Sequence, residues 1–321
     1  ILHSTACLAG IEIAISWACN INQIKSNQIK SIHDKNYNIK FVVSGSSSMN
    51  ITKGAGESLV GRIMIHELNP FTFSEFLKYR GVEHQKLNLK TLKYPNNSEE
   101  LRIHFNEYFE LGGIPEIYED LSIDYLRQML DLLFFRDIIE MFEVKKSSVL
   151  KGIFRIISEK TGQKINYSNI SNNLDTQYRT IKNYIEYLED SFLIKESPPY
   201  ENNTAKSLRK NPKVYISDHS YNNIWKTKNG LKAETIAFNH LKRIEKPYYN
   251  NSPEIDIVLP KKKFGFEIKY TDKITKKDSK SLTELPEEFK LFLVTKDKYD
   301  KWYIKNRKIN LIPLWMLCTS I

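Results

Sequence analysis

The chain has 321 residues, of which 41% are hydrophobic and 12% aromatic, so it can form two or three domains with sizeable cores. Its net charge of +10 favours an anionic partner, nucleic acid before a membrane surface, although abundant Lys, Asn and Ile also fit an A/T-rich genome. The three scattered cysteines show no C-x-x-C spacing, which argues against structural zinc and fits a reducing cytoplasm.

The N-terminal end shows no sign of a membrane or secretion segment. The apolar stretch 6–19 is too short to span a bilayer, contains Glu12 and lacks a basic segment before it. We therefore expect a cytoplasmic protein without a membrane partner. The chain begins at Ile1 and not at Met, which we interpret as a trimmed or incomplete reading frame.

The first predicted strand is the β-branched run Ile39-Lys-Phe-Val-Val43. It ends in a small polar turn that contains Ser46 and Ser47, and open α/β sheets bind ligands at this end of a strand. Two further motifs follow, Leu59-Val-Gly-Arg-Ile63 and Glu67–Leu77. The second predicts a helix that begins near Ser74.

Between residues 120 and 160 the pattern is helical. Apolar residues fall on one stripe of a helix, and we interpret this stripe as the core of a helical domain. They are Leu126, Met129, Leu130, Leu133 and Phe134.

Residues 161–195 predict two successive helices, followed by a strand and the turn Pro198-Pro199. On the polar side of the second helix lie Arg179, Lys182 and Asn183. Such a helix-turn-helix with a wing can place its second helix in the major groove of DNA. Similar modules also bind proteins, and nearby glutamates dilute the positive face, so both interpretations stay open.

The segment Glu254–Tyr270 predicts two short apolar strands joined by the basic turn 261–263. Glu267 and Lys269 share one face of their strand because side chains alternate, and Asp256 on the preceding strand can lie beside them. Two carboxylates and a lysine can hold a divalent cation and a water against a phosphodiester. The basic turn could approach phosphates beside this group. The competing interpretation is a surface hairpin with ordinary charges.

This spacing resembles the PD-(D/E)xK restriction-endonuclease-like superfamily, with Glu234 in the run 233–241 as the helical carboxylate. The resemblance implies that Asp256 and Glu267 bind Mg²⁺ and that Lys269 stabilises the attacking hydroxide or the phosphate. Glu234 would support the metal from its helix.

Six motifs in order resemble the AAA-type P-loop ATPase family that carries a C-terminal DUF4143 region. They are the Gly-Ser-Ser turn at 45–47, Leu-x-Gly-Arg at 59–62, Pro70-Phe-Thr-Phe-Ser-Glu-Phe76, Gly112-Gly-Ile-Pro-Glu116, Arg136-Asp-Ile138 and the end from Pro212-Lys-Val-Tyr-Ile-Ser-Asp218 onward. The resemblance covers about residues 10 to 300.

The family resemblance implies an α/β protein in four parts. We expect a truncated P-loop ATPase core (1–80), a helical lid (81–160), a winged helix-turn-helix (161–204) and a restriction-endonuclease-like DUF4143 domain (205–321). It further implies ATP and Mg²⁺ as cofactors. Ser46 or Ser47 would be the sensor residue, and Arg62 a phosphate or intersubunit contact in a homo-oligomer.

The chain departs from this family at the nucleotide site. It contains no G-x-x-x-x-G-K-[ST] loop, and Ser16 and Trp17 stand where the Walker B acids should be. We therefore expect a cytoplasmic ATP-binding, nucleic-acid-binding protein with impaired nucleotide hydrolysis. The alternatives are a Mg²⁺-dependent nuclease and a non-catalytic remnant that binds DNA or protein.

Overall fold

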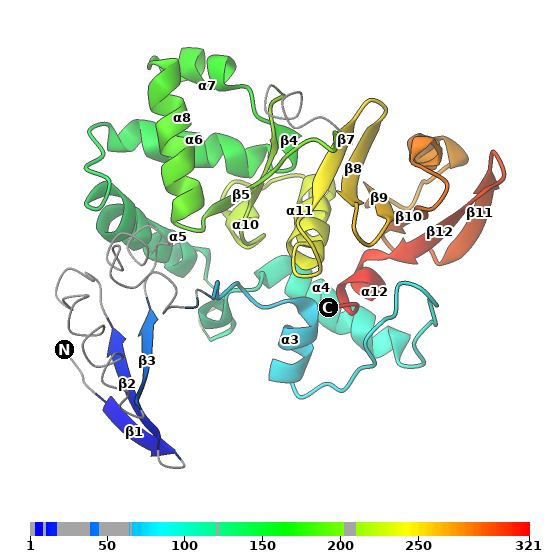
Figure 1. Cartoon of the computed structure of the whole chain (residues 1–321), viewed down its shortest axis with the longest axis horizontal. Coiled ribbons are helices and arrows are strands. Elements are labelled where there is room, and N and C mark those ends of the chain that lie inside the picture. The colour runs from blue at the N-terminus through cyan, green and yellow to red at the C-terminus, as the bar shows by residue number, and fades with distance from the viewer. Residues whose placement is uncertain are drawn as a thin grey trace.

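The computed structural model describes residues 4–8, 11–17, 39–44, 64, 66–119, 122–201 and 210–321, the first three segments and residues 135–137 by their backbone. Ser46, Ser47 and Arg62 lie outside the described residues. The protein combines helices with a six-stranded mixed sheet, so the expected α/β class is confirmed (Figure 1).

The N-terminal strands form a three-stranded sheet in the order β1-β2-β3. They are β1 (Ser4–Leu8), β2 (Ile11–Trp17) and β3 (Ile39–Ser44), so the strand predicted at 39–43 is confirmed. Strands β2 and β3 are parallel and pair Trp17 with Ser44. The carboxyl ends of both strands therefore meet at one edge of this sheet.

Helix α3 (Phe73–Tyr79) begins where the sequence predicts. The Thr72 side chain accepts a hydrogen bond from Glu75 N, and Glu75 in turn accepts from Thr72 N, which completes a capping box. The following elements are α4 (Ser98–Leu111), a 3₁₀ turn (Pro115–Tyr118), α5 (Ile123–Leu132), a π-helical segment (Leu133–Ile139) and α6 (Ser147–Glu159).

A small unit of helices and strands follows around one apolar cluster. It contains α6, β4 (Gln163–Lys164), α7 (Tyr167–Asn173), α8 (Tyr178–Asp190), β5 (Ile194–Ser197) and β6 (Lys213–Ile216). The strands pair antiparallel in the order β4-β6-β5. The unit thus takes a helix and a strand from beyond the expected range 161–204.

The C-terminal part is a sheet of order β11-β12-β10-β9-β8-β7. Its strands β9, β10 and β12 are parallel, and the outer pairs are antiparallel. The elements are α10 (Tyr221–Ile224), α11 (Asn229–Leu241), β7 (Tyr248–Asn251), β8 (Glu254–Leu259), β9 (Phe264–Lys269), two 3₁₀ turns (Lys276–Ser279, Ser281–Glu284), β10 (Lys290–Thr295), β11 (Asp300–Ile304), β12 (Arg307–Pro313) and α12 (Leu314–Cys318). The predicted hairpin of β8 and β9 is confirmed.

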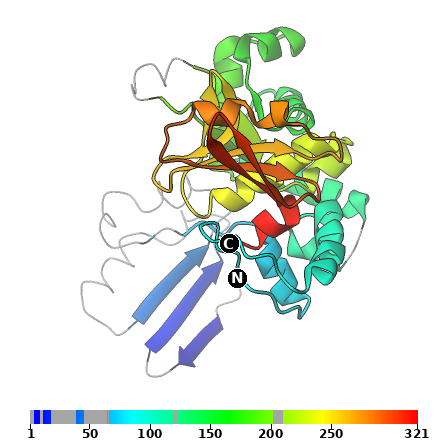
Figure 2. The ribbon, with the colours of Figure 1, turned by 90° about the vertical axis from the view of Figure 1, so that its right-hand side faces the viewer.

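The two faces of the six-stranded sheet pack against different partners. On one face Phe266 and Ile268 join a core with helices α3, α4, α11 and α12, which lie along the sheet in Figure 2. On the other face Leu282 and Leu285 of the 3₁₀ region pack against β10 and β12. Glu267 and Lys269 alternate with Phe266 and Ile268, so they point away from the helical core.

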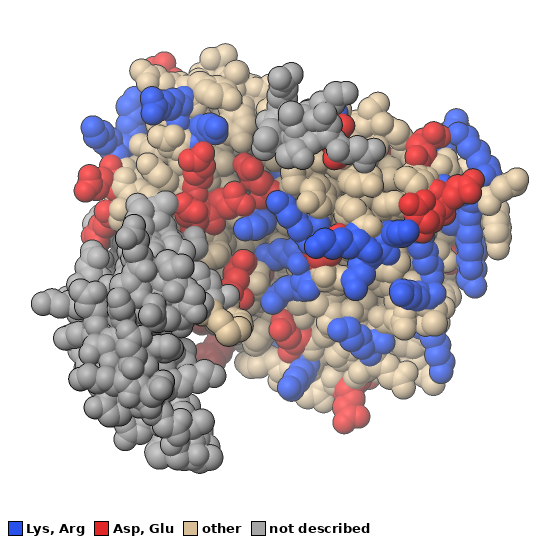
Figure 3. Space-filling model, in the orientation of Figure 1, with Lys and Arg blue, Asp and Glu red and all other residues tan. Residues whose placement is uncertain are grey.

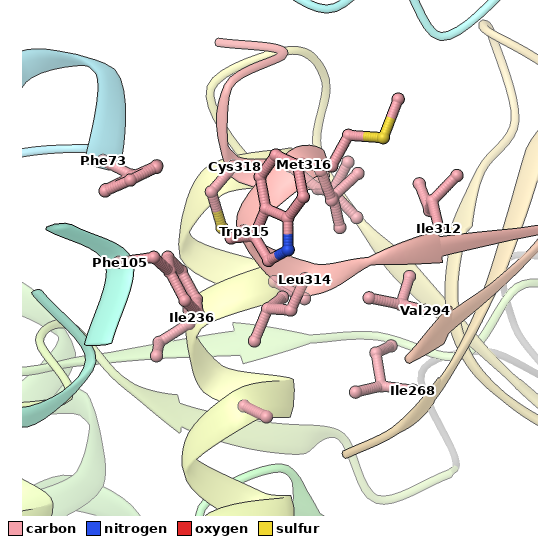
Figure 4. Packing of buried hydrophobic residues seen from close by; sticks show 14 of the residues in the cluster. Phe73, Phe105, Ile236, Ile268, Val294, Ile312, Leu314, Trp315, Met316 and Cys318 are labelled. Atoms are coloured by element: carbon pink, nitrogen blue, oxygen red, sulfur yellow. The ribbon is translucent and has the colours of Figure 1, made fainter. Parts of the chain in front are cut away.

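Helix α12 joins the helices to the sheet. Figure 4 shows α12 between Phe73 and Phe105 on one side and Ile268, Val294 and Ile312 on the other. Phe73, Phe76 and Leu77 of α3 are fully buried in this same cluster. Helix α3 is therefore part of the C-terminal core.

Candidate functional site

The sequence-predicted carboxylates and lysine converge at the open end of the β8–β9 hairpin. Asp256 Oδ2 accepts a hydrogen bond of 3.0 Å from Ile268 N, which fixes it beside the end of β9. Lys269 Nζ donates to Glu267 Oε1 at 2.7 Å. Glu234 comes from α11, as predicted, and reaches the group through a residue that the sequence analysis missed.

That residue is Lys213 on β6. Its Nζ lies 3.0 Å from Glu234 Oε1 and 2.9 Å from Asp256 Oδ1, and its side chain is only 2% exposed. All four residues of β6 are buried, and a buried lysine needs a buried counter-charge. The sequence signal that could have revealed this contact is a lysine at the start of an otherwise apolar strand. We call Lys213, Glu234, Asp256, Glu267 and Lys269 the charged cluster.

Burial and charge set the protonation of Glu234. Burial and the neighbouring Asp256 raise the pKa of Glu234 to about 7, although Lys213 and the Tyr215 hydroxyl, which donates at 2.7 Å, oppose this shift. For Lys213, burial favours the neutral amine, but Glu234 and Asp256 outweigh it and raise its pKa. Lys213 is therefore a permanent cation between two carboxylates.

Glu267 has one satisfied and one unsatisfied oxygen. Oε1 accepts from Lys269, while Oε2 is buried without a hydrogen-bond partner. Burial and the negative charge of Asp256 raise the pKa of Glu267 to about 8. The free oxygen therefore carries a proton at neutral pH or can accept a cation in place of that proton.

A metal at this cluster would have at most two side chains of the protein as ligands. Within the described segments, no group of three or more His, Cys, Asp or Glu side chains is arranged to hold an ion. The Lys213 ammonium separates Glu234 from Asp256, which leaves Asp256 and Glu267 as a pair. Mg²⁺ in phosphoryl-transfer sites commonly uses one or two carboxylates, with waters and phosphate completing its shell. Both Asp256 oxygens accept hydrogen bonds, from Lys213 Nζ and from Ile268 N, whereas Glu267 Oε2 has no partner and is open to an ion.

The prediction that the basic turn lies beside this site is wrong. Lys263 precedes the first residue of β9, and Lys269 is its last residue. A strand of this length places the two ends roughly 20 Å apart. The backbone N–H groups of Lys261 and Lys262 donate to the Glu245 carboxylate instead, which fixes the turn at the far end of the hairpin.

The predicted nucleic-acid contacts lie on α8, away from the charged cluster in the sequence. Arg179 and Lys182 are exposed and Asn183 is half-buried, whereas Ile181 and Ile185 on the opposite side of the helix are buried. The expected polar side of this helix is confirmed.

Two of the motifs that resemble the ATPase family, Gly112–Glu116 and Pro212–Asp218, contact each other. Asp218 accepts hydrogen bonds of 2.8 Å from Gly113 N and from Ser220 N. Gly112 has φ of +101°, and a Cβ on Gly113 would lie 2.8 Å from Asp218 Oδ2. Any side chain at Gly113 would therefore displace Asp218. These residues connect the end of α4 to the end of β6.

Comparison with known proteins finds two segments of the chain similar to two different families. Residues 20–77 match the AAA domain family, which confirms the expected AAA resemblance for this segment. Residues 102–229 match a domain of unknown function (DUF8612), a description different from the DUF4143 region expected from the motifs. The similarity to AAA domains therefore concerns residues 20–77.

Three relatives are uncharacterized proteins. One from Methanocaldococcus jannaschii is 28% identical over 228 residues, 67% of this chain and 49% of the relative. One from Haemophilus influenzae is 25% identical over 308 residues, 88% of this chain and 72% of the relative. One from Mycobacterium tuberculosis is 22% identical over 187 residues, covering 56% and 36%. The chain thus spans about half the length of the first relative.

No solved structure matches the chain. Across the described ranges, every helix is too short or too polar to cross a membrane.

Proposed function

We propose that this protein binds nucleic acid in the cytoplasm and hydrolyses its phosphodiester bonds with Mg²⁺ at the charged cluster. The observation that carries this proposal is the unsatisfied, buried Oε2 of Glu267 in a cluster with Asp256 and Lys269. A buried carboxyl oxygen without a partner can be satisfied by a cation, which would displace the proton that the raised pKa retains.

Each side chain of the cluster has a distinct role in this proposal. Asp256 and Glu267 would hold Mg²⁺, which when bound neutralises phosphate charge and lowers the pKa of a water molecule. Lys269 is 36% exposed at its side chain, so its ammonium can turn from Glu267 toward a phosphate at the surface. There it would stabilise the charge that develops on the phosphate oxygens. Glu234 would act through Lys213 to orient Asp256.

Nucleic-acid binding draws support from the small unit around α8. Three helices with a three-stranded antiparallel sheet are typical of a winged helix, and Arg179 and Lys182 stand exposed on α8. The net charge of +10 favours the same partner.

A second candidate function, ATP binding without efficient hydrolysis, draws support from the AAA match over residues 20–77. In this proposal Ser46 or Ser47 and Arg62 contact nucleotide, and Arg62 can serve a neighbouring subunit in a homo-oligomer. Ser16 and Trp17 stand in place of the acids that hydrolysis needs.

Cleavage of plasmid and linear DNA in the presence of Mg²⁺ or Mn²⁺ tests the main proposal. We expect Lys269→Ala and Glu267→Gln to lower the cleavage rate by about 100-fold or more, because the first removes the cation that stabilises the phosphate and the second removes a carboxylate ligand of Mg²⁺. Lys296→Ala is the control, since Lys296 pairs with Asp272 outside the cluster. Equal, background-level nicking by the unaltered protein and by Lys269→Ala would refute cleavage and leave a non-catalytic interaction module.

A further inference from the structure

The Lys213 ammonium occupies a cage of oxygen atoms inside the protein. Glu234 Oε1 and Asp256 Oδ1 lie within 3.0 Å of Nζ, and Glu254 Oε1 lies at 3.7 Å. Convergent carboxylate oxygens of this kind form a cation site, and here the cation belongs to the chain. Two buried carboxylates this close to one position would repel each other without it.

Further contacts hold Glu234, one of the two buried carboxylates of the cage, in place. Tyr215 OH donates to Glu234 at 2.7 Å, and a Cβ on Gly162 would lie 3.0 Å from Glu234 Oε1. Thr161 Oγ1 contacts Thr235 Oγ1 at 2.8 Å, which holds the loop before β4 against α11. Because the Lys213 side chain is only 2% exposed, its ammonium is the cation that lies between these carboxylates.

We propose that Lys213 is the resident cation of a second, latent divalent-metal position between Glu234 and Asp256. While Lys213 is present, the cluster accepts at most one metal ion, held by Asp256 and Glu267. This limit rests on the proposed function, because it concerns the same site. The cage itself is independent of cleavage, since it is defined by contacts of Lys213 alone.

The space around Lys213 Nζ determines which substitution of Lys213 would allow a metal ion to bind there. Mg²⁺ binds oxygen at about 2.0–2.1 Å and Ca²⁺ at about 2.3–2.6 Å, whereas Lys213 Nζ lies 2.9–3.0 Å from its carboxylates. Lys213→Ala removes the charge and opens space for an ion with its waters. Lys213→Met removes the same charge but fills the space with an apolar side chain.

The test measures thermal unfolding and bound Mn²⁺ on the full chain and its variants. We expect Lys213→Ala to unfold at a lower temperature than the unaltered protein in EDTA, and Mn²⁺ to restore the midpoint by about 5 °C or more. Counting Mn²⁺ by electron paramagnetic resonance should give one more ion per chain than in the unaltered protein.

Two controls make the result specific. Lys213→Met and the double variant Lys213→Ala/Glu234→Gln should show no gain of Mn²⁺ and no restored midpoint, because one lacks space and the other lacks a carboxylate. Equal Mn²⁺ effects in all three variants, or none in Lys213→Ala, would overturn the proposal. If Lys213→Ala is unfolded in EDTA, refolding with Mn²⁺ supports the proposal, and failure to refold contradicts it. Absence of DNA cleavage would not change these readouts.

Discussion

Two buried histidines, His219 and His240, are neutral in the folded protein. His240 Nε2 accepts a hydrogen bond of 2.8 Å from Phe73 N, so its proton lies on Nδ1, which donates to Ile236 O. Burial lowers the pKa of His240 to about 3. Burial likewise lowers the pKa of His219, which contacts Tyr108 O, to about 4. Both histidines thus fix packing between α3, α4 and the C-terminal part.

His240 gives stability that acid removes. In the unfolded chain, His240 binds a proton as the pH falls below about 6.5. In the folded protein it stays neutral down to about pH 3. Acid therefore favours the unfolded state, and the stabilisation is lost as the pH falls below 6.5. By pH 5, protonation of the unfolded histidine has removed roughly 2 kcal/mol of the stability that is present at pH 7. Glu234 and Glu267 act in the opposite sense, because their raised pKa values stabilise the fold at low pH. The effect of His240 is therefore measured as the difference in unfolding free energy between the unaltered protein and a variant that lacks this histidine.

We expect His240→Gln to be less stable than the unaltered protein at pH 7, and this deficit to shrink by roughly 2 kcal/mol at pH 5. Urea unfolding at a series of pH values measures it. The exposed His66 provides the control, since His66→Gln should leave the difference at zero throughout. A deficit that is independent of pH would show that His240 does not titrate on unfolding.

At this scale the sequence predicted part of the cluster. Alternation along β9 placed Glu267 and Lys269 together, and the hairpin brought Asp256 beside them. Lys213 escaped prediction because it lies 43 residues before Asp256 and on a different sheet. Local periodicity reports which face a side chain takes, but it does not report which distant strand approaches that face.

Helices and strands were predicted better in their position along the chain than in their packing. The capping residues of α3 and the β8–β9 hairpin follow from local chemistry, and both lie where expected. The partner of α3 is set by long-range apolar contacts, so the sequence pattern did not reveal that α3 packs with α12. The helical stretch 120–160 was expected from one stripe, but a π-helical segment at Leu133–Ile139 interrupts it.

Helix α3 makes a testable contribution to the core. Phe76 is fully buried and packs near Tyr108 and Tyr118. Phe76→Ala should lower the free energy of unfolding by about 3–5 kcal/mol, because it leaves a cavity in a dense cluster. Ile103→Ala on the exposed side of α4 is the control and should change it by less than about 0.5 kcal/mol. Similar small losses in both variants would mean that α3 is dispensable.

Among the described residues, basic side chains gather on at least two surfaces. One is the exposed side of α8, and the other covers the region between α11 and β12, where Figure 3 shows Lys and Arg close together. At the start of β10, Lys290 has its pKa lowered by burial and by the like charges of Lys308 and Lys301. An anion relieves mutual repulsion of this kind, and the proposed nucleic-acid partner would supply phosphate anions.

Salt titration of DNA binding separates the two surfaces. For Arg179→Ala/Lys182→Ala we expect the log–log salt slope to fall by about 2, since each lost phosphate contact lowers it by about 0.9. Residual binding should remain through the second surface. Lys151→Ala/Arg155→Ala changes the net charge equally, but its residues already pair with Asp131 and Glu159, so the slope should hold. Equal losses in both variants would mean that only net charge matters.

The burial of α3 has a consequence for how this protein can be divided. The AAA match ends at residue 77, yet Phe73, Phe76 and Leu77 belong to the core that α12 completes at the other end of the chain. The segment that matches the AAA family therefore ends inside the hydrophobic core of the C-terminal part. A fragment cut at the family border would expose an apolar groove along α4 and α12, whereas a fragment that begins before Glu67 would keep its core, its capping box and the ion pair of Glu67 with Lys242.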